Sequence, residues 1–191
     1  MATRSPPPDR ISGNLALDLA NTISWRGTAR ETDHLADADA IVAWVKAVGL
    51  VPGNFAIPAA RRAAFEADVH GLRDAVMRAG KAIAEGKPPP KDALAAIRDL
   101  AANSLASASL RGAPLEISFA QEDRILGALA WAALDLLRSD ELDRLKRCPA
   151  DNCRWLFLDR TKNRSRRWCD MATCGNQAKA RKHRAFQCDG G

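Results

Sequence analysis

The segment that decides the C-terminal fold is Cys148-Pro-Ala-Asp-Asn-Cys153, followed after fifteen residues by Cys169-Asp-Met-Ala-Thr-Cys174. Four of the five cysteines thus form two pairs with the same spacing. Two such pairs suit one tetrahedral zinc ion bound by four thiolates, and four protein ligands leave no open position for a substrate. Free buried cysteines and an iron–sulfur cluster are the alternatives. We predict one structural zinc ion (Zn2+) held by Cys148, Cys153, Cys169 and Cys174.

The residues around the cysteines predict a small zinc-dependent fold. Residues 154–159 predict a strand with Trp155 and Phe157 on one side, and residues 165–169 are expected to return antiparallel to it. A helix is expected to start near Cys174, which gives a treble-clef-like arrangement. A module of about 40 residues cannot fold on apolar burial alone, so zinc must supply much of its stability.

The positive charge of the chain is concentrated around these cysteines. The formal net charge is +6, yet residues 1–147 contain 19 Lys/Arg and 19 Asp/Glu. Residues 148–187 contain 10 Lys/Arg and 3 Asp. Such a concentration is the electrostatic footprint of a protein that binds a polyanion. The alternative is a solvated basic tail, which would need neither tryptophans nor paired cysteines.

The N-terminal three quarters of the chain show the periodicity of helices. A first helix is expected over residues 15–23, and Asp37 or Asp39 is expected to cap a second. The clearest apolar seam lies within residues 58–84, where apolar residues recur at steps of three and four. A fourth helix follows, with Leu94 among the residues expected to face inward.

The last part of this helical region leads toward the zinc module. Alternating apolar residues at 115–119 predict one short strand, and the apolar run from Ile125 is expected to continue as a helix toward the first cysteine. The predicted fold class is therefore mainly α. It comprises a helical N-terminal domain with one or two short strands, plus a small C-terminal four-cysteine zinc module of β-hairpin and helix.

Changes in composition divide the chain into a disordered tail (1–12), a helical domain (13–145), a zinc finger (146–187) and a second disordered tail (188–191). On this division, loss of a cysteine ligand should unfold the zinc module and leave the helices folded. No run approaches the roughly 20 apolar residues of a membrane span, and the N-terminus lacks the apolar region of a signal peptide. We expect a cytoplasmic protein with reduced cysteines and no membrane partner.

Polar residues also cluster on or just after the first predicted helix, namely Asp18, Asn21 and Arg26. They could line a pocket for a small-molecule effector. Alternatively they form a structural network, in which Asn21 helps to end the helix and Asp18 holds a neighbouring turn or arginine. The sequence has no glycine-rich phosphate loop and no nucleophile elbow, so we expect no enzymatic activity.

Three segments carry a family resemblance: Leu17-Asp18-Leu-Ala-Asn21-Thr22, Asn163-Arg-Ser-Arg-Arg-Trp-Cys169 and Cys174-Gly-Asn. With them the chain resembles the CGNR zinc-finger proteins that carry an N-terminal ABATE domain, a bacterial family described as stress-induced transcription regulators. One departure is Gln177, where the family has the arginine of its name. The resemblance implies a regulator, and it identifies neither a target nor an effector.

The basic residues of the zinc module are the candidates for contact with nucleic acid, together with Asn176, whose amide can pair with adenine. They lie at the expected hairpin tip, on the return segment and on the last helix: Lys162, Arg164, Arg166, Arg167, Lys179, Arg181, Lys182 and Arg184. Duplex DNA is favoured over RNA, because tryptophans in the core of the module leave little aromatic surface for base stacking.

We predict a zinc-containing DNA-binding transcription regulator whose N-terminal domain senses a ligand or mediates dimerisation. The alternative is a protein-interaction adaptor whose structural zinc finger docks an acidic partner or RNA. Sequence preference for a duplex would fit only the first. A homodimer is expected from the habits of DNA-binding proteins.

Overall fold

A computed structural model of the chain describes residues 10–119 and 123–188, and within the last helix it describes the side chains up to Arg181 and that of Arg184. Six α-helices occur in these residues: α1 (Leu15–Ala20), α2 (Ala38–Ala47), α3 (Arg62–Ala84), α4 (Lys91–Ala106), α5 (Arg124–Arg138) and α6 (Asn176–Cys188). The mainly α fold class is thus confirmed, with short hairpins and a four-cysteine C-terminal module.

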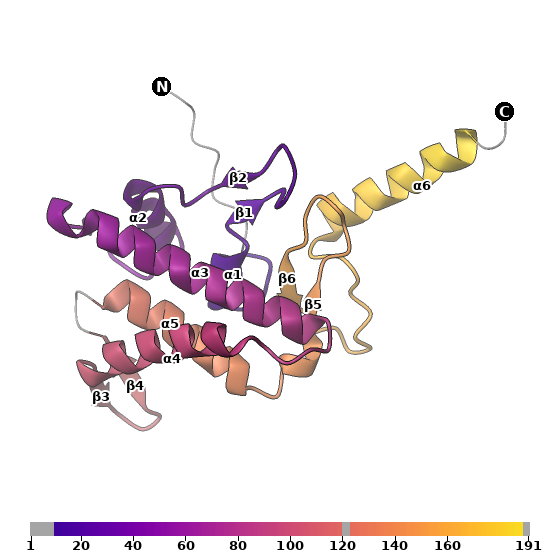
Figure 1. Cartoon of the computed structure of the whole chain (residues 1–191). Helices are drawn as coiled ribbons and strands as arrows, with labels where there is room; N and C mark the ends of the chain where they lie inside the picture. Colours follow the sequence, from indigo (N-terminus) through magenta and orange to yellow (C-terminus); the bar gives the residue numbers. More distant parts are fainter. Residues whose placement is uncertain (1–9, 120–122, 189–191) are drawn as a thin grey trace.

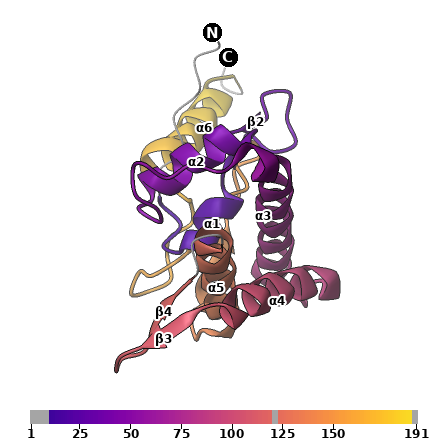
Figure 2. The same cartoon turned by 90° about the vertical axis from the view of Figure 1, so that its left-hand side faces the viewer.

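Three two-stranded antiparallel hairpins complete the described part of the fold. They are β1 (Ile23–Ser24) with β2 (Thr32–Asp33), β3 (Ser109–Arg111) with β4 (Glu116–Ser118), and β5 (Leu145–Arg147) with β6 (Leu156–Leu158). The β3–β4 hairpin and α6 project from the helical body at opposite ends (Figure 1 and Figure 2). None of the described helices is long and apolar enough to span a membrane.

The core is built around α3, which packs against α1, α2, α4 and α5. Its predicted seam is confirmed: Phe65, Val69 and Leu72 are among its buried residues. Asp37 caps α2, since its carboxylate accepts a hydrogen bond from the Ala40 N–H at 2.8 Å. These agreements follow from local chemistry, because apolar periodicity and N-caps are encoded within one helix.

Several boundaries differ from the sequence prediction. Helix α1 is only six residues long, and Ile23 lies in β1. On α4 the buried apolar residues are Ala93, Ile97 and Ala101, whereas Leu94 is 36% exposed. The single strand expected at residues 115–119 is present as β4. It pairs with β3, a strand that the sequence did not predict.

The last helix of the N-terminal region also ends earlier than expected. Helix α5 stops at Arg138, where Ser139 adopts an extended conformation and its hydroxyl donates to the Leu136 carbonyl. A short 3-10 turn (Leu142–Arg144) and then β5 lead to Cys148. The apolar residues after α5 therefore belong to a turn and a strand, which is why helical periodicity misjudged them.

The predicted hairpin partner of β6 was wrong. β6 pairs with β5, which precedes the first cysteine, and residues 165–169 form no strand. The pairing continues past the strands, because the Cys148 N–H donates to the Trp155 carbonyl at 2.8 Å. The sequence gives no long-range signal for this choice, since β5 has only three residues.

β6 has two buried faces, as its alternation predicted. Leu156 and Leu158 join the core of the helical domain, together with Leu145 from β5, while Phe157 packs among the cysteines. Gly80 on α3 makes room for this contact, because a Cβ there would lie 2.6 Å from Leu156 Cδ1. The zinc module and the helical domain therefore share one hairpin, whose strand β6 packs one face into each of their two apolar clusters.

Residues 11 and 12, which the sequence assigned to a disordered tail, pack against the rest of the chain. Ser12 is fully buried, its N–H donates to the Asp18 carboxylate at 3.2 Å, and its carbonyl accepts from the Leu158 N–H at 2.9 Å. Ser12 thus lies on the edge of β6 that β5 leaves open. The remainder of that predicted tail, residues 1–9, and residues 189–191 of the C-terminal one lie outside the described residues.

Candidate metal centre and basic surface

The four predicted cysteine ligands come together at one point. The sulfurs of Cys148, Cys153, Cys169 and Cys174 all lie within 4.8 Å of one another. The Cys153–Cys169 and Cys169–Cys174 sulfur separations are 3.4 and 3.6 Å. A tetrahedron with Zn–S bonds of about 2.3 Å has sulfurs roughly 3.8 Å apart, so the cluster fits one zinc ion.

Two local structures hold the ligands in place. Cys148 and Cys153 flank a tight turn between β5 and β6, closed by the Cys153 N–H donating to the Ala150 carbonyl at 3.0 Å. Cys174 lies in a π-helical turn (Met171–Gly175) that leads into α6, and the Asp170 carboxylate caps it by accepting from the Thr173 N–H at 2.9 Å. The predicted helix start beside the last cysteine is therefore confirmed.

The electrostatics of the bare thiols explain why a cation belongs here. Hydrogen bonds from the thiols of Cys153 and Cys169 lower the pKa of Cys148. Hydrogen bonding to Cys148 raises the pKa of Cys153 and Cys169, and burial raises that of Cys174. One thiolate thus disfavours the others, and a divalent cation removes this conflict by stabilising all four.

An apolar shell surrounds the sulfurs. Phe157 is fully buried among them, and Ile11, Trp155 and Trp168 pack around the same cluster. The Trp155 indole N–H donates to the Ile23 carbonyl at 3.0 Å, which ties this shell to the N-terminal region. The shell is small, as expected of a module that depends on metal for its stability.

An ion pair between the partly exposed Lys146 and a buried carboxylate holds the chain that runs between the two cysteine pairs. Asp159 is fully buried, and its carboxylate accepts from Lys146 Nζ at 2.6 Å and from the Thr161 hydroxyl at 2.6 Å. Lys146 Nζ also donates to the carbonyls of Arg164 and Arg166. Burial alone would raise the pKa of Asp159, but the hydrogen bonds from Lys146 and Thr161 outweigh it and hold that pKa well below its usual range.

Asp159→Asn is expected to destabilise the protein by about 3 kcal/mol at neutral pH, because it leaves the Lys146 ammonium without its counter-charge. A lowered folded-state pKa gives stability that is present above the unfolded-state pKa of about 3.9 and is lost as the pH falls through the folded value. The difference in unfolding free energy between wild type and variant should therefore narrow toward pH 4 and below. Urea titrations of both proteins at matched pH test this, and a difference independent of pH would contradict it.

The predicted contact residue Arg166 has an internal role. Its guanidinium stacks over the Phe157 ring at 4.5 Å and donates to the carbonyls of Trp168, Ile11 and Cys169. These contacts fold residues 165–169 around the apolar shell of the metal centre. Arg166 is thus poorly placed to contact a phosphate, and its removal would disturb the centre itself.

The other basic side chains of the module fall into two groups. Arg164 pairs with Asp143 at 2.6 Å, and Arg144, Arg147 and Arg160 are likewise engaged with other residues of the chain. The second group is exposed and has no ion pair with the described part of the chain: Arg154, Lys162, Arg167, Lys179, Arg181 and Arg184. Of this group, Arg167 lies over the Trp168 ring at 5.5 Å, which is a cation–π contact.

Two further predicted contact residues lie on α6, and one basic residue was missed. Asn176 is exposed, and its amide donates to the Ala172 carbonyl at 3.0 Å. The Lys182 side chain lies outside the described ones. The missed residue is Arg154, which is exposed and directly follows the ligand Cys153. Its position next to a ligand could have placed it among the candidate contact residues.

The residues proposed for an effector pocket have structural partners. Asp18 is 7% exposed, accepts from the Ser12 N–H and pairs with Arg10 at 3.6 Å. Burial raises the pKa of Asp18. Burial also lowers the pKa of Arg26, which donates to the Ala20 carbonyl at 3.4 Å.

Asn21 is a clamp between the two parts of the chain. Its amide donates to the Leu156 carbonyl at 2.8 Å, and its side-chain oxygen accepts from the Leu156 N–H at 2.9 Å. Both backbone groups of Leu156 are thus satisfied on the free edge of β6, as a neighbouring strand would satisfy them. Of the two interpretations of these polar residues, the structural network accounts for Asp18 and Asn21.

Fold and site together define a helical domain fused to a four-cysteine zinc finger with a projecting basic helix. The chain belongs to the ABATE family, described as "putative stress-induced transcription regulator", which matches residues 13–140. The CGNR zinc finger matches residues 144–186. A search among curated proteins finds no match.

Proposed function

We propose that this protein is a non-enzymatic transcription regulator that binds duplex DNA through the zinc finger and senses a ligand through the helical domain. The observation that carries DNA binding is the separation of the basic residues into two groups. One group makes internal contacts, while six exposed cations form no ion pair with the residues that the structure describes. Internal structure therefore explains only part of the charge of the module, and a polyanion explains the rest.

Helix α6 is the element best suited to enter a groove. It has 13 residues and projects away from the body in Figure 1. It carries Lys179, Arg181 and Arg184 on an exposed surface. A bare helix has the width of the major groove, and three cations along it can reach phosphates on both sides.

The start of α6 offers groups that can read bases. Gln177 is exposed, and its side-chain oxygen accepts a hydrogen bond from the Asn152 amide at 3.2 Å. Gln177 occupies the position of the family arginine and lies one helical turn before Arg181. We therefore expect Gln177 to contribute to recognition with its amide, in place of a charge.

The test is binding to duplex DNA across a salt series, with genomic fragments competing against bulk DNA. Lys179→Ala, Arg181→Ala and Arg184→Ala in one variant should weaken binding by roughly 100-fold or more at low salt. The slope of log K against log salt should fall by about 2.7, since each lost phosphate contact removes about 0.9.

A matched control removes three exposed cations from the helical domain and the β3–β4 hairpin: Lys81→Ala, Lys91→Ala and Arg111→Ala. It changes the net charge equally and should leave the salt slope unchanged. Equal losses of DNA affinity in both variants would mean that binding depends only on the net charge of the protein. Strong binding of an acidic protein, with no preference among duplexes, would favour an adaptor.

The structure offers a physical route from the helical domain to the finger. β6 contributes Leu156 and Leu158 to the helical core and Phe157 to the metal centre, so this one strand connects the two. A ligand that shifts α1, α3 or α5 would also shift β6, because these elements pack in one core. We expect the helical domain to modulate the finger through this hairpin.

A further inference from the structure

Helices α4 and α5 leave a groove of about 360 Å³ between the first half of α4 and the last turns of α5. Its apolar walls are formed by Leu94 and Ile97 from α4 and by Leu134 and Leu137 from α5. The volume lies within the range of sites for small ligands, which is about 300–1,000 Å³. The groove therefore offers an apolar chain a place to bind on the outside of the helical domain.

Leu94 shows that the two helices leave apolar surface uncovered here. It is 36% exposed, whereas Ile97, three residues later, is 1% exposed. Leu134 and Leu137 are half-buried and border the same space from α5. A ligand that covers these side chains removes apolar surface from water, which favours binding.

The charged side chains among the described residues that line the groove are all cations, namely Lys91, Arg98 and Arg138. Arg98 is paired with its neighbour Asp99 at 2.7 Å. Lys91 and Arg138 are exposed and have no ion pair with residues that the structure describes. Lys91 is the first residue of α4 and Arg138 is the last of α5, so one anionic group at this end of the groove can reach both.

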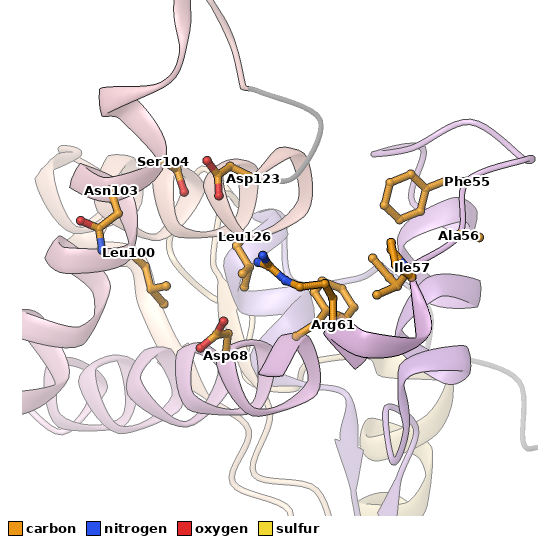
Figure 3. Close-up of a pocket in the computed structure, with 12 residues that line it drawn as sticks. Phe55, Ala56, Ile57, Arg61, Asp68, Leu100, Asn103, Ser104, Asp123 and Leu126 are labelled. Carbon is orange, nitrogen blue, oxygen red and sulfur yellow. The ribbon is translucent and has the colours of Figure 1, made fainter. Parts of the chain in front are cut away.

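A larger pocket of about 530 Å³ lies beside the second half of α4, and its charges select a ligand less clearly (Figure 3). Arg61, Asp68 and Asp123 all line it, so it contains charges of both signs. Arg61 interacts with another residue of the chain, and the Asp123 carboxylate accepts from the Ser107 hydroxyl at 2.9 Å. The groove is the more selective of the two, because its charged lining has one sign and two of its cations are unpaired within the described structure.

We infer that the groove binds a free medium-chain carboxylate, such as octanoate. Lys91 and Arg138 hold the carboxylate, and the four apolar side chains pack along the alkyl chain. The groove extends from Lys91 to Arg98, about two turns and roughly 10 Å of α4, which accommodates a chain of this length. Nucleic acid gains nothing from the leucines, and a cationic amphiphile is repelled by the rim.

The floor of the groove also reaches the part of the core that supports the zinc finger. Ile97 and Leu137 line a small internal void of about 10 Å³, together with Leu17 of α1 and Leu145 of β5. A chain that packs on Ile97 and Leu137 therefore contacts side chains that adjoin the β5–β6 hairpin. The inference deepens the proposed sensing role, on which its regulatory meaning rests, while carboxylate binding itself is measured without DNA.

The experiment is calorimetric titration of the zinc-loaded full chain with octanoate at millimolar concentration. Two compounds serve as comparisons: butanoate, which keeps the carboxylate and shortens the chain, and octylamine, which keeps the chain and reverses the charge. We expect octanoate to bind at one site per chain, and both comparison compounds to bind about tenfold more weakly or worse.

Substitutions in the groove should weaken octanoate binding according to what they remove. Lys91→Met and Arg138→Met should each weaken it about threefold, and the double variant about tenfold, because each takes away one exposed charge. Leu94→Glu should weaken it about tenfold or more, because it removes an apolar wall and adds a charge of the same sign as the ligand.

Matched control variants make the same substitutions outside the groove. Lys81→Met and Arg124→Met remove a lysine and an arginine from exposed positions on α3 and α5, and Leu110→Glu changes a leucine of β3 that is 54% exposed. All three should bind octanoate like wild type.

Three results would overturn the assignment: no binding of octanoate, wild-type affinity in both Leu94→Glu and the Lys91→Met, Arg138→Met double variant, or equal affinity for octylamine. If octanoate binds but leaves DNA affinity unchanged, the groove assignment stands and the proposed sensing role fails. If the protein binds no DNA at all, the calorimetric result is unaffected.

Discussion

Cys169→Ser is expected to abolish stoichiometric zinc binding and to lower the stability of the whole protein, including the helical domain. The loss should be on the order of 5 kcal/mol, a part of the roughly 10 kcal/mol or more that structural zinc supplies to isolated fingers. For a chain of this size such a loss lowers the melting temperature by about 10–20 °C.

The reason lies in the hairpin that the two parts share. Without zinc, no metal ion links Cys148 to Cys153 across the turn between β5 and β6. Phe157, on one face of β6, then loses the ordered cysteine cluster against which it packs. The other face carries Leu156 and Leu158, which are 0% and 2% exposed within the helical core. Fraying of β6 would expose both leucines, so the helical domain is weakened together with the finger. This expectation replaces the sequence-based one, in which the helices stayed unaffected.

Elemental analysis and thermal unfolding followed by helical circular dichroism measure the two effects. Cys188→Ser is the matched control, since it makes the same substitution at the cysteine outside the four-cysteine cluster. It should retain one zinc ion and the wild-type melting temperature. A Cys169→Ser protein that keeps one tightly bound zinc would refute the ligand assignment. One that loses zinc with an unchanged helical transition would refute the coupling.

Asn21→Ala is expected to destabilise the protein by about 2–4 kcal/mol, although Asn21 is neither a cysteine ligand nor a proposed nucleic-acid contact. The substitution leaves the N–H and carbonyl of buried Leu156 without partners, and each unsatisfied group costs about 1–3 kcal/mol. It should also speed the loss of zinc to a chelator, because that edge of β6 is then held only by the hydrogen bond from the Leu158 N–H to the Ser12 carbonyl.

Urea denaturation and zinc release to a chromogenic chelator test this prediction. Asn163→Ala, an exposed position in the finger, is the control and should change stability by less than about 0.5 kcal/mol. A loss in Asn21→Ala as small as that of the control would mean that water replaces the clamp. In that case Asn21 would regain its place among candidate effector residues.

The sequence predicted the parts of the metal centre that depend on spacing. Two cysteine pairs, a turn between the first two ligands and a helix start at the last one are local features, and all are present. The sequence also predicted which residues lie on each face of β6, because side chains alternate along any strand whatever its neighbours are. Which strand pairs with β6 was mispredicted, because β5 is too short to carry a pattern of its own.

The basic residues of the finger also show which properties the sequence predicts and which only the structure reveals. Composition established that the finger is basic, but it treated Arg164, Arg166 and Arg181 as equivalent. In the structure Arg166 folds the metal shell, Arg164 pairs with Asp143, and Arg181 is exposed. The difference depends on carbonyls and carboxylates that are distant in sequence or brought near by turns.

By itself, then, the sequence determined the helical class of the N-terminal region, the zinc ligands and the location of the excess charge. These follow from periodicity, ligand spacing and composition, which are encoded within a few neighbouring residues. The tertiary structure decided that Asn21 binds β6 across 135 residues of sequence, that the two parts share the β5–β6 hairpin, and that Arg61, Asp68 and Asp123 face one pocket. Each of these depends on helices and strands packing against one another, and no short-range pattern specifies how distant elements meet.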